Sequence, residues 1–84
     1  MLKNLSFSEA LILLKSGQRV AREGWNGKGM WLDLVPADKY TALNIQNGLL
    51  PWIGMATADK HFVPWLASQT DLLASDWCCL SDEE

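Results

Sequence analysis

The sequence has few of the residues from which catalytic and metal sites are usually built. It contains one histidine, His61, and two cysteines, Cys78 and Cys79, which are adjacent. Adjacent cysteines do not easily satisfy the geometry of a disulfide, and no activating base or metal-ligand spacing accompanies them. A triad of Ser68, His61 and Asp71 is disfavoured, because Ser68 and Asp71 suit the cap and the first turn of a helix. We therefore expect no catalytic residues, no metal and no cofactor.

Long apolar runs and an excess of basic charge are also missing. No stretch is long enough to span a membrane, and no signal-peptide core follows Met1. Seven Lys and Arg against ten Asp and Glu give a net charge of −3, which argues against a nucleic-acid polymer as partner. Because six of the seven basic residues precede residue 40, a locally positive site for a small anion is still compatible with the acidic whole. Together with reduced cysteines, these features predict a cytoplasmic protein without a membrane partner.

What the chain does contain is a series of short helical and strand patterns, which predict an α+β fold in one domain over residues 1–84. The expected architecture is a small antiparallel sheet with an N-terminal helix and a short C-terminal helix. Ser6 and Glu9 suit a capping box for the first helix, over residues 6–16, and Gly17 is the natural residue to end it. Because such a small domain often gains stability by association, we expect a homo-oligomer.

The remaining segments predict two hairpins, a second helix and a final strand. The strands are expected over residues 18–23, 30–35, 52–58, 61–65 and 76–80, and the short helix over residues 68–74. Residues 37–50 have weak periodicity and are expected to form an excursion, with one short strand over residues 40–45. Pro64 restricts its strand to an edge or its own position to a strand end.

Apolar spacing also predicts which side chains face the core. The strand over residues 18–23 is expected to point Val20 inward and Ala21 outward, and the final strand to bury one of its two cysteines. On the strand over residues 30–35, three side chains are expected to share one face: Trp31, Asp33 and Val35. Three leucines are expected to give the short helix a core face: Leu66, Leu72 and Leu73.

Five tryptophans are many for 84 residues, and they indicate an aromatic pocket, a surface between subunits, or both. One of them, Trp25, stands in a loop with three glycines in six positions, together with Lys28. A hairpin turn needs neither an indole nor an ammonium. This combination suits the stacking of a flat ring beside amides that hold an anion. The alternative, in which Trp25 folds back onto the core, is equally compatible with the residues.

The tryptophans are accompanied by polar residues that suit a nucleotide. Asn26, Lys28 and the amides of the glycine loop could hold phosphates, while Gln69 and Asp71 could hydrogen-bond ribose hydroxyls. Stacking of a base on an aromatic side chain contributes roughly 1–3 kcal/mol. The inventory therefore indicates a nucleotide-like ligand that is bound without turnover. The candidate ligand-binding residues are Trp25, Asn26, Gly27, Lys28, Trp65, Gln69, Asp71 and Trp77.

Two blocks of the sequence resemble a small family of phage and prophage proteins. The first block is Arg22-Glu-Gly-Trp-Asn-Gly-Lys-Gly-Met30, and the second is Val63-Pro-Trp-Leu-Ala-Ser-Gln-Thr-Asp-Leu-Leu-Ala-Ser-Asp-Trp77. The helix that begins at Ser6 and ends before Gly17 fits the same pattern. On these residues the chain resembles the Thoeris anti-defence proteins of the second type.

The resemblance implies a sponge for an immune signal. Members of that family bind the cyclic ADP-ribose isomer made by bacterial TIR-domain proteins without cleaving it, in the cytoplasm of the infected host. Some also resemble sponges for the cyclic oligonucleotides of CBASS-type signalling. The family fold assembles as a dimer of dimers, with ligand pockets between protomers. Two other functions stay open for this chain: an enzyme that degrades the signal, and a phage module that blocks a host protein directly.

The resemblance also implies roles for the candidate residues. Trp25 would stack on a base, and Asn26 would contact ribose or phosphate beside it. From the short helix, Trp65, Gln69 and Asp71 would complete the pocket. Trp77 is a candidate either for the pocket or for the core.

Overall fold

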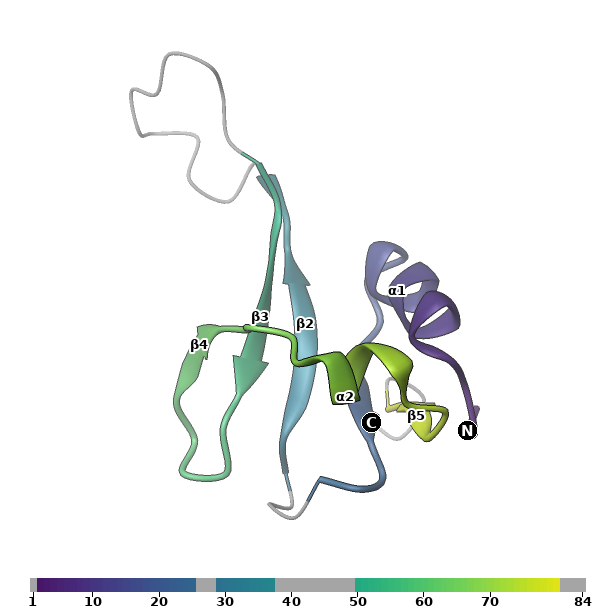
Figure 1. Ribbon diagram of the computed structural model, residues 1–84. Helices are drawn as coiled ribbons and strands as arrows, with labels where there is room; N and C mark the ends of the chain where they lie inside the picture. The colour runs from purple at the N-terminus through teal and green to yellow at the C-terminus, as the bar shows by residue number, and fades with distance from the viewer. Residues whose placement is uncertain (1, 26–28, 38–49, 81–84) are drawn as a thin grey trace, which may run out of the picture.

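The computed structural model describes residues 2–25, 29–37 and 50–80, and in these residues five strands form one antiparallel sheet (Figure 1). The strand order is β4-β3-β2-β1-β5, so the last strand in the sequence lies at the edge beside the first. The elements are α1 (Phe7–Lys15), β1 (Val20–Arg22), β2 (Trp31–Val35), β3 (Trp52–Ala56), β4 (Phe62–Pro64), α2 (Gln69–Leu73) and β5 (Trp77–Cys79). The α+β architecture predicted from the sequence is thereby confirmed. The strand expected over residues 40–45 lies outside the described residues.

The first helix forms where its local signals place it. The Ser6 side chain accepts a hydrogen bond from the Glu9 backbone N–H, and the Glu9 carboxylate accepts one from the Ser6 backbone N–H, which completes the capping box. At the other end, Gly17 has a φ of +92°, the left-handed conformation that glycine adopts most readily. None of the helices in the described part of the chain is long and apolar enough to span a membrane.

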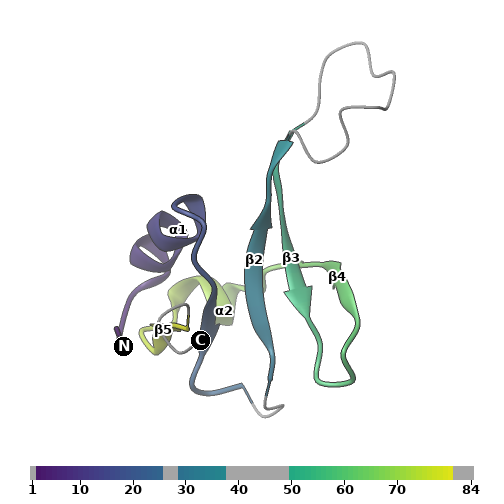
Figure 2. The same ribbon diagram turned by 180° about the vertical axis from the view of Figure 1, so that it is seen from behind.

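The core lies between the helices and one face of the sheet (Figures 1 and 2). Its fully buried members come from four elements: Ala10, Leu14, Val20, Leu32 and Trp77. Trp77 is the largest of them, and its ring lies 5.3 Å from that of Phe7 between centroids. The final strand therefore contributes the largest side chain of the core.

The register of the sheet separates two faces. Leu32 pairs with Met55, and both side chains point toward the helices. Trp31 pairs with Ala56, and the side chains of β2 alternate from there, so the predicted common face of Trp31, Asp33 and Val35 is confirmed. On this second face Arg19 lies over the Trp31 ring, 4.2 Å from its centroid, and forms an ion pair of 3.9 Å with Asp33.

The second hairpin ends at a sheet edge. β4 pairs only with β3 in the described sheet, so Pro64 occupies an edge strand, as its missing N–H requires. Pro64 lies opposite Gly54 in the register, and the Phe62 ring covers the space where a side chain at Gly54 would stand. Lys60 turns the chain between the two strands with a φ of +71°.

Three predictions about burial were wrong. Both Cys78 and Cys79 are buried, and so is Ala21, because Ala21 and Cys78 pair in the register and their small side chains lie side by side on the second face. The leucines expected to face the core from the short helix do not do so either: Leu72 and Leu73 on α2 are exposed, the latter by 82%, and Leu66, which lies before α2, is 92% exposed. A helix of five residues presents one side to the protein, and on α2 that side carries Asp71.

Candidate functional site

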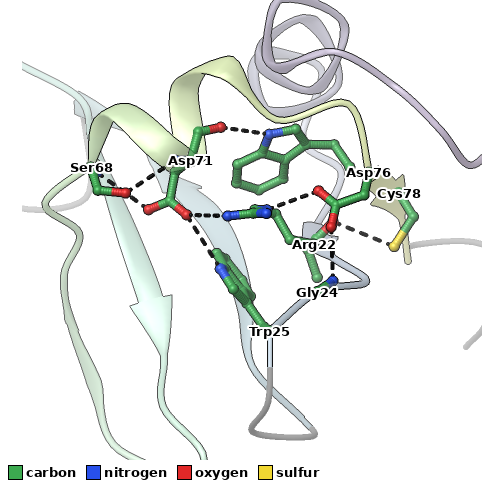
Figure 3. A network of polar contacts seen from close by, with 9 residues as sticks. Arg22, Gly24, Trp25, Ser68, Asp71, Asp76 and Cys78 are labelled. Atoms are coloured by element: carbon green, nitrogen blue, oxygen red, sulfur yellow. Dashed lines mark hydrogen bonds and ion pairs between the residues drawn. The ribbon is translucent and has the colours of Figure 1, made fainter.

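The end of β1 and the start of α2 meet beside Trp25, where Arg22 joins two carboxylates (Figure 3). Arg22 Nη1 donates to Asp71 Oδ1 at 2.9 Å, and Arg22 Nε donates to Asp76 Oδ1 at 2.8 Å. The Arg22 side chain is only 16% exposed, so both ion pairs are largely shielded from solvent. The guanidinium thus ties β1 to the start of α2 and to the residue that precedes β5.

The Asp71 carboxylate accepts hydrogen bonds from three residues, two of them outside its own helix. Its Oδ1 atom accepts from Arg22 and also from Trp25 Nε1, at 3.4 Å, and its Oδ2 atom accepts from the Ser68 backbone N–H at 3.3 Å. The Ser68 hydroxyl in turn accepts from the Asp71 backbone N–H, so the two residues form the capping box of α2. Partial burial acts to raise the pKa of Asp71, but the hydrogen bonds from Arg22, Ser68 and Trp25 hold it below the ordinary aspartate value. The site therefore contains an ionised carboxylate.

Asp76 fixes the backbone that leads into Trp25. Its Oδ2 atom accepts from the Gly24 N–H at 2.9 Å, while its Oδ1 atom accepts from Arg22. The hydrogen bond from Arg22 is the main cause that lowers the pKa of Asp76. A Cβ atom at Gly24 would lie 2.8 Å from Asp76 Oδ2, which favours glycine at this position of the loop.

Three indoles converge next to these charges. The fully buried Trp77 packs edge-on against Trp25 at 5.5 Å and against Trp65 at 6.0 Å between ring centroids. Trp77 Nε1 donates to the Asp71 backbone carbonyl at 3.0 Å, so the core and the carboxylate cluster are directly connected. Trp25 and Trp65 are half-buried and keep part of each ring accessible. The accessible parts of Trp25 and Trp65 therefore provide aromatic surface, and both rings are supported by the buried indole of Trp77.

The structure brings together four of the residues predicted for the site: Trp25, Trp65, Asp71 and Trp77. Gln69 is exposed at the first position of α2, two residues from Asp71. Asn26, Gly27 and Lys28 lie outside the described residues. Trp77 belongs to the core, the alternative that the sequence left open for it. Trp25 folds back onto the core, where it packs against Trp77 and is half-buried, while its stacking on a ligand ring stays a prediction.

The ion pair between Arg22 and Asp76 was not predicted from the sequence. Arg22 is the first residue of one block and Asp76 the penultimate residue of the other. A signal was present, since an arginine on a strand that precedes a glycine loop needs a carboxylate if it is to be buried. Only the fold shows that two carboxylates meet it.

A hollow of about 430 Å³ lies elsewhere, on the second face of the sheet. Its lining residues are Gly29, Trp31, Ala56, Thr57, Lys60, His61 and Phe62. The rings of Trp31 and Phe62 are 6.0 Å apart between centroids. We place the candidate site at Trp25 and Trp65 because the predicted residues meet there, and the hollow is a second position at which a ligand ring could bind.

The side chains considered for catalysis are not arranged as a catalytic triad or as a reactive thiol in the described residues. His61 Nδ1 pairs with Asp59 Oδ1 at 3.2 Å on the exposed turn between β3 and β4, whereas Ser68 and Asp71 are joined in their capping box. Burial raises the pKa of the Cys78 thiol, which makes its reactive thiolate scarce. Within the described residues, no cluster of three or more His, Cys, Asp or Glu side chains could hold a metal ion.

Comparisons with known proteins agree with the pattern of the two blocks. The model of the Thoeris anti-defense 2-like domain matches residues 5–80, a range that contains both blocks and the whole cluster described above. A protein of Bacillus phage SP01 named Thoeris anti-defense 2 is 40% identical over 90 aligned residues, which cover 96% of this chain and the full length of that relative. The resemblance seen in the sequence is thereby confirmed. The chain belongs to the Thoeris anti-defense 2-like family, and this membership supports a phage anti-defence role.

Proposed function

We propose that the protein binds a cyclic nucleotide immune signal, a cyclic ADP-ribose isomer made by Thoeris TIR-domain proteins, and sequesters it without cleaving it. The observation that carries the proposal is that two half-exposed indoles, Trp25 and Trp65, pack against the same buried Trp77, and that Trp25 also donates to the ionised carboxylate of Asp71. Flat rings that carry hydroxyl and phosphate groups match this combination of aromatic surface and hydrogen-bonding groups. Cyclic oligonucleotides of CBASS-type signalling share this chemistry and are further candidate ligands.

The proposed contacts follow from the geometry. A base stacks on the accessible part of Trp25, which contributes roughly 1–3 kcal/mol, and a second ring can use Trp65 in the same way. A carboxylate offers about four acceptor positions. The Asp71 carboxylate accepts hydrogen bonds from Arg22, Trp25 and Ser68, and a ribose hydroxyl is proposed to approach its exposed part. Gln69 supplies an amide on the same helix, and Asn26 and Lys28 are proposed to contact ribose or phosphate.

A stoichiometric trap needs more than these contacts. Nanomolar binding corresponds to about −12 kcal/mol, which stacking on two indoles does not supply. We propose that a second copy of the chain encloses the ligand, in a homo-oligomer built as a dimer of dimers. Leu66 and Leu73, 92% and 82% exposed beside the site, support this, because exposed leucines of this kind suit a surface between subunits.

The proposal treats the protein as a binder and not as an enzyme. His61 lies on an exposed turn and pairs with Asp59, and the thiols of Cys78 and Cys79 are buried. Neither arrangement supplies a base or a nucleophile to the indole cluster. These observations favour sequestration over degradation as the way in which the chain opposes a signal.

The experiment follows the fate of the ligand. The protein is mixed with a panel of cyclic ADP-ribose linkage isomers and cyclic oligonucleotides, the free fraction is removed, and the protein is denatured by heat. Recovery of the intact compound in stoichiometric amount supports sequestration. A processed product instead identifies a signal-degrading enzyme, and the absence of any retained compound contradicts the proposal.

A matched pair of variants locates the site. Trp25→Ala is expected to abolish retention of the ligand, while Trp31→Ala, which removes an indole from the hollow on the second face, is expected to leave it intact. The reverse result would place binding in the hollow. Retention of anti-defence activity by Trp25→Ala, together with its loss after substitution of the exposed Ile12 on α1, would instead identify a module that blocks a host protein directly.

A further inference from the structure

We propose that Arg22 is a positioning residue for the candidate site, and this inference rests on the proposed function. Arg22 orients the Trp25 indole through Asp71 and fixes the backbone of Trp25 through Asp76, without contacting the ligand itself. It is the one side chain in Figure 3 that contacts both carboxylates, and they come from opposite sides of it. The affinity of the stacking surface therefore depends on a residue behind that surface.

The contact between Arg22 and Asp71 fixes the orientation of the Trp25 indole ring. Asp71 Oδ1 accepts from Arg22 Nη1 at 2.9 Å and from Trp25 Nε1 at 3.4 Å, so one oxygen atom is shared by the guanidinium and the indole. The Asp71 side chain is only 15% exposed. Without Arg22 this carboxylate is a poorly solvated, uncompensated charge, and it gains by turning toward water. When the carboxylate turns, Trp25 loses its acceptor.

The contact between Arg22 and Asp76 fixes the backbone on either side of Gly24, which leads into Trp25. Asp76 holds the Gly24 N–H with Oδ2 while Oδ1 accepts from Arg22, and the Trp25 N–H donates to the Arg22 carbonyl at 3.3 Å. Both the indole and the main chain of Trp25 are thus fixed relative to one arginine. Edge-on packing against Trp77 limits the ring further, but the polar edge of the indole is set by Asp71 alone among the described contacts.

An arginine suits this task better than a lysine. The planar guanidinium presents separate donors in a fixed fork, so Nε and Nη1 can serve carboxylates from two different elements at once. A lysine ammonium is a single charge on a flexible stem and satisfies this pair of directions less well. Arg22→Lys is therefore expected to keep the charge and to lose part of the orientation.

The test measures ring orientation and affinity separately. Arg22→Gln and Arg22→Lys are compared with Arg19→Gln, which makes the same change on the opposite face of the sheet, beside Trp31. The indole N–H signals are followed by ¹H–¹⁵N NMR, with Trp25→Phe and Trp77→Phe to assign two of them. Affinity for the cyclic ADP-ribose isomer that the wild type retains is measured well below each melting temperature.

For Arg22→Gln we expect a moved Trp25 indole signal, an unmoved Trp77 signal and binding about tenfold weaker, since a hydrogen bond that orients the ring is lost. Arg22→Lys lies between this variant and the wild type, and Arg19→Gln matches the wild type in both readings. If Arg22→Gln does not fold, Arg22→Lys supplies the same two readings.

Two outcomes overturn the inference. In one, the Trp25 signal and the affinity of the Arg22 variants stay at wild-type values. In the other, the variants lower the melting temperature while the Trp25 signal does not move, which shows a structural role only. Failure of the proposed function is distinguishable from both, because it appears as a wild-type protein that retains no cyclic nucleotide, while the NMR reading still decides whether Arg22 orients Trp25.

Discussion

Gly24 offers a sharp test of how the loop before Trp25 is held. Its φ lies outside the left-handed range, so alanine can adopt the same backbone conformation. The cost of Gly24→Ala is therefore steric: the new Cβ atom would stand 2.8 Å from Asp76 Oδ2, closer than real Cβ contacts allow. Either the carboxylate or the loop must shift, and the hydrogen bond from the Gly24 N–H to Asp76 is the contact that breaks.

The magnitude follows from the contact that is lost. A hydrogen bond to a charged group contributes about 1.5–3 kcal/mol, and partial exposure of Asp76 favours the lower end of that range. For a domain of this size, 1 kcal/mol moves the melting temperature by roughly 4–8 °C. We therefore expect Gly24→Ala to lower the melting temperature by about 6–12 °C. Protomer concentration must be held constant, because an oligomer melts at a temperature that depends on it.

A double-mutant cycle with Asp76→Ala separates this mechanism from a general effect on the loop. Removal of the Asp76 carboxylate also removes the obstacle, so Gly24→Ala is expected to cost less than about 0.5 kcal/mol in that background. Thermal unfolding of the four proteins gives the coupling energy. An equal cost of Gly24→Ala with and without the carboxylate would refute the reasoning, because the steric conflict would then lie elsewhere.

Three further predictions concern charge, packing and assembly. The pKa values of both carboxylates that pair with Arg22 are lowered in the folded protein, so their stabilising effect is fully present above the ordinary aspartate pKa of about 4 and is lost as the pH falls through the lower folded values. The melting temperature should thus be level from neutral pH down to about 5 and fall below about 4, and a fall that begins above pH 6 would contradict this assignment. Gly54→Ala should displace the Phe62 ring and destabilise the protein by about 1–2 kcal/mol through lost aromatic contacts, measured by urea unfolding. Leu66→Ser with Leu73→Ser should shift the protein toward monomers in analytical ultracentrifugation while its helix and strand content, seen by circular dichroism, stays unchanged; an unaltered sedimentation coefficient would exclude this surface as the interface.

Local signals were enough to predict most of the elements. The capping box at Ser6, the turn before His61 and the proline at the sheet edge each act within a few residues, and each is where the sequence placed it. The position of β5 beside β1 could not be predicted, because it depends on a pairing such as Val20 with Cys79 between distant segments. The burial of both cysteines was not predicted for the same reason, because it also depends on this pairing between distant segments.

The site shows the same division. Trp25, Trp65 and Asp71 were selected from the sequence because their chemistry suits a nucleotide, and the fold brings them together. Arg22 was not selected, because its importance depends on two carboxylates that follow it by about fifty residues. The leucines on and before α2 were misassigned, since apolar spacing in so short a helix carries little information on which side faces the protein.

The position of Trp77 has a consequence for how the protein matures as it is synthesised. The ring that fills the centre of the core, the strand that carries it and both carboxylates that hold Arg22 all lie within residues 71–79, so they are synthesised after the first helix and both hairpins. A nascent chain that still lacks residues 69–80 has its first helix and hairpin but lacks the Trp77 side chain and the β5 strand that complete the core. Competence to capture a ligand should therefore arise only after residues 69–80 have left the ribosome, and chains interrupted before that point should be cleared by cellular proteases.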